Sequence, residues 1–172
     1  MAKLQVFYSF HFDNDVMRVQ QIRNIGAIEG NEPVSVNEWE QARKTPGGIE
    51  RWIDNNMKYK SCVVVLIGSE TASRPWVKHE IRKGWYDGKG IVGIYIHNLK
   101  DPRTSKIPPY FGKCSQGPNP FDQIRMTNGL TLSNYVTCYN PNPNEAYSDI
   151  AVNLTTWIEN AIRLRKGSNE VR

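Results

Sequence analysis

The sequence predicts an α/β fold in which helices cover both faces of a mainly parallel, five-stranded sheet. Two almost wholly apolar runs, Cys62–Ile67 and Ile91–Ile96, are typical of parallel strands that are buried on both faces. Segments whose apolar residues recur at helical spacing alternate with these strand-like segments, which favours strand–helix–strand crossovers. The chain has 172 residues, 39% hydrophobic and 23% charged, and this size and composition suit one globular domain.

The first part of the chain contains two predicted strand–helix units. Leu4–Phe10 alternates in polarity and favours a strand, and Asp13 or Asn14 would cap the helix that follows it. Pro33–Val36 is a short candidate strand, followed by a polar loop and a helix after Gly48. The apolar faces of these helices would consist of Val16, Val19, Ile22 and Ile25 in the first, and of Ile49, Trp52, Ile53 and Met57 in the second.

The middle of the chain contains the predicted central strand, Cys62–Ile67. Pro75 lies near the expected start of the next helix, because proline is favoured in the first helical turn, and Gly88 lies beyond its end. Ile91–Ile96 then follows as a second buried strand. Together with the units before it, this alternation indicates a flavodoxin-like, three-layer αβα fold.

The last part combines an irregular segment, a strand and a helix. Leu99–Gly129 is rich in Pro, Gly and Asn, as lids and insertions in compact domains often are. Thr131–Tyr139 is the expected last strand. We expect a single domain over residues 1–166 and a frayed tail over residues 167–172. The final helix would place on one side Tyr147, Ile150, Ala151, Leu154, Trp157, Ile158, Ala161 and Ile162.

Charge and cysteine content exclude several classes of function. The net charge of +5 comes from Lys and Arg interspersed with acidic residues, so we expect a solvated surface and no nucleic-acid partner. Cys62, Cys114 and Cys138 are far apart and have no histidine at metal-ligand spacing, so we expect neither disulfides nor a metal site. The N-terminal residues lack a signal-peptide pattern and no apolar run could span a bilayer, so we expect a cytoplasmic protein without a membrane partner.

The predicted topology indicates where a ligand would bind. In open α/β sheets, ligands bind outside the carboxyl ends of the strands where the strand order reverses, which in flavodoxin-like order is between the first and third strands. Two segments would meet there, Ser9–Asp13 and Gly68–Trp76. Both are rich in hydroxyl and aromatic side chains.

Glu80 is the candidate catalytic residue on the helix that begins near Pro75. It would lie at the edge of the buried face, beside the indole of Trp76 and next to space left by Gly84. A solvated surface carboxylate between Lys78 and Lys83 is the competing interpretation. The buried ridge of this helix would consist of Val77, Ile81 and Trp85, and the adjacent row of Trp76, Glu80 and Gly84.

Three motifs resemble the landmarks of the TIR-domain family. They are VFYSFHFDND, SCVVVLIGS and SRPWVKHEI, which match the first strand with its following loop, the third strand, and the helix with a W-x-x-x-E pattern. More closely, the chain resembles the TIR-like group that includes the ThsB proteins of the bacterial Thoeris antiphage system. The resemblance covers residues 3–100. It departs from the family at Val77, where many TIR domains have cysteine, and over Leu99–Gly129, which has no counterpart.

The resemblance implies an enzyme that cleaves NAD, with Glu80 as the catalytic carboxylate and NAD as a substrate rather than a bound cofactor. It also implies that the ADP-ribose moiety is cyclised into a diffusible signal that activates a partner effector, and that the protein self-associates when activated. The same match places around the substrate Ser9, Phe10, His11, Asp13, Asn37, Ser69 and Trp76. Turn formation, capping or packing is the competing role for Asp13 and Phe10, and likewise for Ser69 and Trp76.

Two other functions use the same fold. A receiver-like phosphoacceptor domain needs an aspartate after the third strand and paired acids to bind magnesium, but here the third strand ends at Ile67-Gly68-Ser69. A non-catalytic TIR-type adaptor, which acts by domain association, requires no chemistry at Glu80. The sequence disfavours the receiver and leaves the adaptor as the alternative to the enzyme.

Overall fold

The computed structural model describes residues 4–25, 28–29 and 42–168 and contains one sheet of five parallel strands. The strand order is β2-β1-β3-β4-β5, and every neighbouring pair is parallel. Three longer strands form the centre, and the two edge strands have only two residues each. This order confirms the flavodoxin-like prediction. The strands are β1 (Leu4–Ser9), β2 (Ile28–Glu29), β3 (Cys62–Ile67), β4 (Gly90–Tyr95) and β5 (Cys138–Tyr139).

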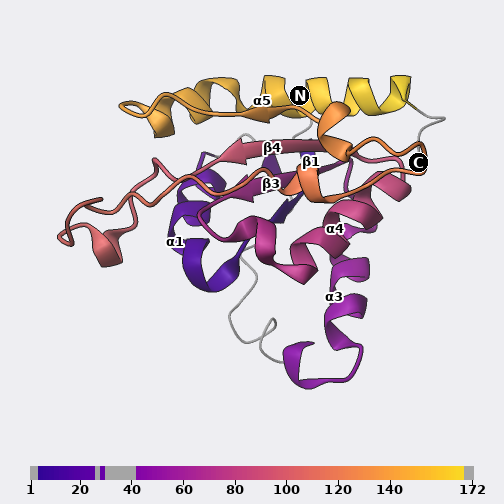
Figure 1. The fold of residues 1–172 in the computed structure, drawn as a ribbon, viewed down its shortest axis with the longest axis horizontal. Helices are drawn as coiled ribbons and strands as arrows, with labels where there is room; N and C mark the ends of the chain where they lie inside the picture. Colours follow the sequence, from indigo (N-terminus) through magenta and orange to yellow (C-terminus); the bar gives the residue numbers. More distant parts are fainter. Residues whose placement is uncertain (1–3, 26–27, 30–41, 169–172) are drawn as a thin grey trace.

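Helices cover both faces of the sheet. Figure 1 shows α5 along one side of the strands and α3 and α4 on the other. None of the helices in the described part of the chain is both long and apolar enough to cross a lipid bilayer. The helices are α1 (Phe12–Arg23), α3 (Gly48–Met57), α4 (Pro75–Tyr86) and α5 (Ala146–Gly167).

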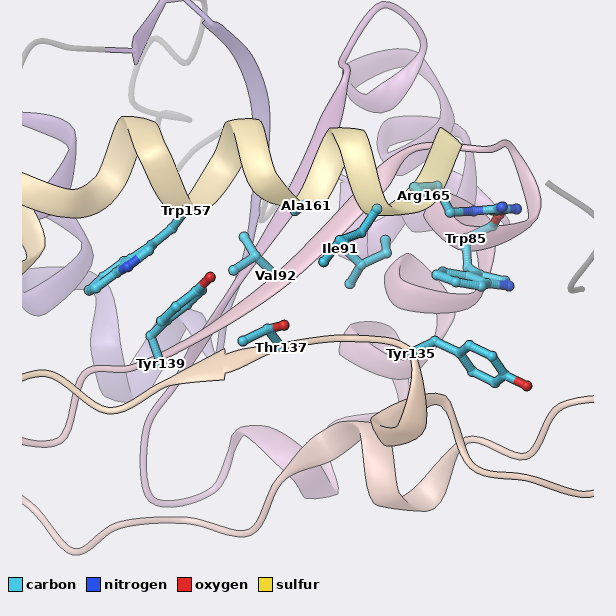
Figure 2. Close-up of a pocket in the computed structure, with 10 residues that line it drawn as sticks. Trp85, Ile91, Val92, Tyr135, Thr137, Tyr139, Trp157, Ala161 and Arg165 are labelled. Carbon is cyan, nitrogen blue, oxygen red and sulfur yellow. Dashed lines mark hydrogen bonds between the residues drawn. The ribbon is translucent and has the colours of Figure 1, made fainter. Parts of the chain in front are cut away.

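A buried arginine joins the ends of α4 and α5. Arg165 is 3% exposed, and its guanidinium donates to the carbonyl oxygen of Trp85 at 2.8 Å. The guanidinium carbon also lies 4.1 Å from the centre of the Trp85 ring, a cation–π contact that can be followed in Figure 2. These contacts hold the last turn of α5 in place beside the edge of the sheet.

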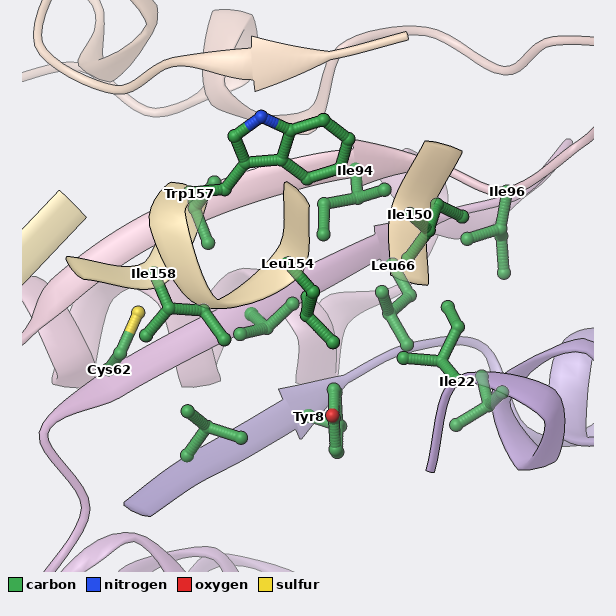
Figure 3. Packing of buried hydrophobic residues seen from close by; sticks show 14 of the residues in the cluster. Tyr8, Ile22, Cys62, Leu66, Ile94, Ile96, Ile150, Leu154, Trp157 and Ile158 are labelled. Atoms are coloured by element: carbon green, nitrogen blue, oxygen red, sulfur yellow. The ribbon is translucent and has the colours of Figure 1, made fainter. Parts of the chain in front are cut away.

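The strands alternate in the face to which they point, which divides the core in two. Val64 and Leu66 of β3 face α1 and α5, in the cluster that Figure 3 shows. Val63, Val65 and Ile67 face α3 and α4. All of these side chains are fully buried, as the uninterrupted apolar sequence of β3 predicts.

In the first part of the chain, the structure corrects the predicted cap of α1 and leaves one predicted strand untested. The predicted cap of α1 by Asp13 or Asn14 is wrong, because the helix begins at Phe12 after His11, and no side chain caps it. Asp13 therefore lies in the first turn, where its charge favours the helix dipole. The candidate strand Pro33–Val36 lies outside the described residues.

The predicted strand Thr131–Tyr139 is largely wrong. Leu132–Asn134 forms a 3₁₀ turn, and only Cys138–Tyr139 pairs with β4. Leu132 is fully buried, so its apolar character reflects packing rather than a strand conformation. The segment Leu99–Gly129 has only short 3₁₀ turns, as its composition predicts.

Gly90→Ala tests the packing of α5 on the sheet. A methyl group at Gly90 would lie 2.7 Å from the backbone nitrogen of Ile162 and 2.9 Å from the carbonyl carbon of Ala161, so the helix would have to move. We expect the free energy of unfolding, measured by urea denaturation, to fall by about 1–3 kcal/mol. Gly167→Ala is the matched control, because nothing lies within 4 Å of the added methyl group. Equal stability of the two variants would contradict the close contact.

Candidate active site

The candidate site lies at the carboxyl ends of β1 and β3. These strands are hydrogen-bonded neighbours, with Ser9 opposite Val65 in the register. Because β2 lies on the other side of β1, the chain direction of the crossovers reverses between β1 and β3. The last residues of β1 and the loop that leads into α4 therefore meet at this edge, as the sequence predicts.

Glu80 points from α4 into the protein rather than into solvent. The ridge of Val77, Ile81 and Trp85 is buried against the sheet, as expected from the spacing. Glu80 in the adjacent row is only 9% exposed, so the interpretation as a solvated surface carboxylate is wrong. The helix that covers the sheet thus carries a carboxyl group into a largely apolar layer.

Ser9 reaches the same layer from the sheet. Side chains two residues apart in a strand share a face, so Ser9 lies on the side of Phe7, which packs with α3 and α4. Ser9 is fully buried, and its hydroxyl lies close enough to Glu80 to influence the pKa of that carboxyl group. Neither Ser9 Oγ nor Glu80 Oε2 has a hydrogen-bond partner among the described residues.

Burial dominates the ionisation of Glu80. It raises the pKa of the carboxyl group from 4.5 to about 8, and the Ser9 hydroxyl opposes only part of this rise. At neutral pH the group is therefore mainly protonated and uncharged. A buried polar atom without a partner destabilises a fold, and such atoms are concentrated where a protein binds or transforms a ligand.

His11 forms a second polar group at the end of β1. It is 8% exposed, and its Nδ1 lies 3.8 Å from Glu70 Oε2. Burial and the nearby Arg74 guanidinium lower the pKa of the imidazole. The ring is thus neutral at physiological pH and can accept a hydrogen bond as well as donate one.

Ser69 is held by α1. It is half-buried, and its hydroxyl accepts a hydrogen bond of 3.4 Å from the Asn14 amide, which also donates to Glu70 at the same distance. Asp13 is exposed in the first turn of α1. Phe10 packs against the core on the α1 and α5 side, so it lies on the opposite face from Glu80.

Trp76 stands at the outer rim of the site. Its side chain is 38% exposed, and its ring meets the His79 ring edge-on at 5.9 Å between centroids. Trp76 also borders a groove of about 340 Å³ that Arg43 and Lys44 line from the helical residues 42–44, which precede α3. Asn37, the remaining predicted site residue, lies outside the described residues.

Gly84 leaves no space beside Glu80, contrary to expectation. A methyl group at Gly84 would lie 2.6 Å from Val63 Cγ2 and 3.1 Å from Ile91 Cδ1. The missing side chain therefore lets α4 approach the sheet.

The cavity drawn in Figure 2, at the far end of α4, holds only about 10 Å³, room for one water molecule.

The sequence interpretation missed three polar residues. Glu70 and Arg74 are four residues apart and form an ion pair of 3.9 Å beside His11. His79 has a buried Nε2 without a partner among the described residues, and it follows Trp76 by three residues on the same helix. This helical spacing places His79 on the same side of the helix as Trp76, and it could have identified His79 from the sequence. Within the described ranges, no three His, Cys, Asp or Glu side chains are placed to hold a metal ion.

Glu80→Gln tests the buried carboxyl group through the pH dependence of stability. Because the pKa of Glu80 is higher in the folded chain than its usual 4.5, the folded state retains a proton that the unfolded state releases. The stability that this proton provides is complete below about pH 4.5 and is lost as the pH rises through about 8, by up to about 1.4 kcal/mol per pH unit. Glutamine cannot ionise, so this slope should disappear in urea denaturation between pH 5 and 8.

The exposed Glu159 supplies the control for this experiment. Glu159→Gln should retain the wild-type slope, and contributions from the histidines are common to all three proteins. Parallel curves for wild type and Glu80→Gln would show that the carboxyl group ionises freely in the folded protein.

The chain is similar to known proteins of one family. A family model described as "Thoeris protein ThsB, TIR-like domain" matches residues 7–101, more than half of the chain, and this range includes both Ser9 and Glu80. A protein of Bacillus cereus (strain MSX-D12), named "Putative cyclic ADP-D-ribose synthase ThsB1", is 37% identical over 130 residues. The match covers 72% of this chain and 64% of that relative's length. The chain therefore belongs to the family of TIR-like domains of Thoeris ThsB proteins.

Proposed function

We propose that this protein cleaves the bond between nicotinamide and ribose in NAD, with Glu80 as the catalytic carboxylate. The observation that carries the proposal is the buried carboxyl group of Glu80, whose Oε2 has no hydrogen-bond partner among the described residues, close to Ser9 at the switch point of the sheet. The membership of the ThsB TIR-like family and the name of the Bacillus cereus relative support this chemistry.

The reaction requires a negative charge near the ribose. As the bond from C1′ to the nicotinamide nitrogen breaks, its electron pair leaves with nicotinamide and positive charge develops on the ribose ring. An ionised Glu80 next to C1′ would stabilise this charge. A nucleophile, either water or a group of the ADP-ribose moiety itself, then forms the new bond to C1′. Attack by water gives linear ADP-ribose, and internal attack gives a cyclic product.

The raised pKa of Glu80 fits a site that is silent at rest. The carboxyl group is protonated at neutral pH and only 9% exposed, so it is neither charged nor accessible. The nicotinamide ring of NAD carries a positive charge, and a cation next to a carboxyl group lowers its pKa. Substrate entry would thus both open the site and generate the anion that the reaction uses.

We propose that the product is a cyclic ADP-ribose that signals to a partner effector in antiphage defence. The name of the relative, a cyclic ADP-D-ribose synthase, supports the cyclic product, and the Thoeris family supports the defence role. The surrounding polar groups suit the other parts of NAD. Arg43 and Lys44, in the groove beside Trp76, could pair with the pyrophosphate, and the neutral His11 could bind a ribose hydroxyl.

The protein could instead be a non-catalytic adaptor. The burial of Glu80 is compatible with this alternative, because a protonated, inaccessible carboxyl group can also be a purely structural element. The two functions differ in turnover, which an adaptor lacks under every condition.

Nicotinamide release from NAD distinguishes the two functions. We expect purified protein, activated with extract of phage-infected cells, to release nicotinamide, and Glu80→Gln to reduce the rate by about 100-fold to 1,000-fold because the developing charge loses its partner. Glu159→Gln, which changes an exposed carboxylate, should be fully active. Mass spectrometry of the product would separate cyclic from linear ADP-ribose.

Two results would contradict the proposal in different ways. Equal rates for wild type and Glu80→Gln would remove Glu80 from the mechanism. Absence of turnover in activated wild-type protein would favour the adaptor.

The dependence of kcat/KM on pH tests the ionisation that the mechanism requires. This ratio reports ionisations of the free enzyme. It should therefore rise with pH along a titration curve whose midpoint lies near pH 8, where Glu80 becomes anionic. Ser9 lowers the pKa of Glu80, so Ser9→Ala should move the midpoint to higher pH. A profile that is flat between pH 6 and 9 would show that the active form has an ordinary carboxylate.

A further inference from the structure

Residues 101–112 form a closed surface loop after β4. The backbone N–H of Asp101 donates to the carbonyl oxygen of Gly112 at 2.8 Å, which joins the two ends of the loop. Within it, Phe111 N–H donates to the Ile107 carbonyl at 3.0 Å. A compact loop of this length with adjoining ends is an Ω-loop, a type of segment that is frequently functional. Figure 1 shows it projecting from the body of the molecule at the left.

The base of the 101–112 loop is anchored by a buried arginine of α1. Arg18 is 5% exposed and donates to the carbonyl oxygens of Leu99 at 2.9 Å and Gly112 at 2.8 Å. Its charge is balanced by Asp15, which is fully buried 3.0 Å away. The loop therefore presents its outer residues from a fixed base.

The tip of the loop is apolar and exposed. Ile107, Tyr110 and Phe111 have exposed fractions of 58%, 55% and 54%, and two prolines lie between them. Phe111 has a φ of 46°, a backbone region that a bulky aromatic residue rarely occupies. Packing within the domain does not explain this arrangement, because these side chains cover no core. Contiguous exposed apolar side chains of this kind indicate a binding surface.

The flanks of the tip are positively charged. Lys100, Arg103 and Lys106 are exposed, and Lys113 follows at the end of the loop. Asp101 is the single acidic residue between positions 100 and 113, and it is 3% exposed and paired with Arg103 at 2.7 Å. The loop thus combines an apolar tip with an excess of positive charge around it.

We propose that the 101–112 loop inserts its tip into the interface of an anionic lipid bilayer. Stable peripheral binding needs two signals, and this loop supplies both apolar insertion and attraction between lysines and anionic headgroups. Aromatic residues favour the same interfacial depth, with Tyr110 able to keep its hydroxyl in the headgroup layer. Lysine is depleted in protein–protein interfaces, so the lysine-rich flanks favour lipid over a protein partner.

The tip residues of this loop are not among those assigned to the NAD chemistry. The family match ends at residue 101, where the loop begins, so the exposed tip of the loop lies outside the matched range. A loop that inserts only its tip binds a bilayer without crossing it, so the lack of a spanning segment, on which the expectation of no membrane partner rested, does not bear on this surface.

Flotation with lipid vesicles tests the proposal. We expect wild-type protein to float with vesicles that contain phosphatidylglycerol, to remain in solution with pure phosphatidylcholine, and to dissociate as the salt concentration rises. A triple variant, with Ile107, Tyr110 and Phe111 replaced by serine, should bind at least about tenfold more weakly. Lys106→Ala should weaken binding roughly fivefold, the effect of one cation near an anionic surface.

A second triple variant provides the matched control. Tyr59, Val152 and Leu164 are exposed apolar residues outside the loop, with exposed fractions of 80%, 79% and 49%, and their replacement by serine should leave binding unchanged. If the loop variant melts at a lower temperature, Lys106→Ala and the salt dependence decide the question. Wild type that stays in solution with both vesicle types, or equal binding by the two triple variants, would overturn the proposal. The first result would leave the tip as a contact for a protein.

Discussion

The complete burial of β3 is the constraint on which the rest of this structure depends. Every side chain of Cys62–Ile67 is fully buried, so the strand is stable only if helices cover both of its faces. The faces are then unavailable for binding, and polar chemistry is confined to the ends of the strands. β1 and β3 are neighbours in the sheet, but the chain leaves them toward opposite edges of the sheet. The residues that follow these two strands therefore form the site where Ser9 and the start of α4 meet.

The same packing explains why Glu80 is buried. α4 presses its ridge of Val77 and Ile81 onto the face of the sheet to which Ser9 also points, and Gly84 lets the helix approach closely. Glu80, in the adjacent row, is carried into this layer with its Oε2 unpartnered. Burial favours the protonated form of this group, so the fold loses stability as the pH rises and the proton is released. A carboxyl group that opposes stability at the switch point of the sheet is what a functional requirement would maintain.

Features that depend on the local sequence pattern could be predicted, whereas features that depend on contacts between distant residues could not. Cys62–Ile67 was predicted to the residue, because a continuous apolar run of that length has few other interpretations. The prediction of a strand over Thr131–Tyr139 failed, because a buried leucine such as Leu132 occurs both in strands and in turns. Helical spacing placed Glu80 only at the edge of the buried face, whereas the structure buries it. The role of Asn14 could not be predicted, because its bond to Ser69 joins residues that are distant in the chain.

The ionisation of Glu80 connects the stability of this domain to its proposed chemistry. A carboxyl group that is protonated in the folded resting state contributes no charge to a reaction, and its buried position denies access to a ribose. Any change that admits solvent or a cation to the group lowers its pKa and creates the anion. Exposure and activation are therefore one event rather than two. In the proposed reaction, a proton leaves the site when NAD binds near neutral pH, and its release follows from the burial that the fold imposes on Glu80.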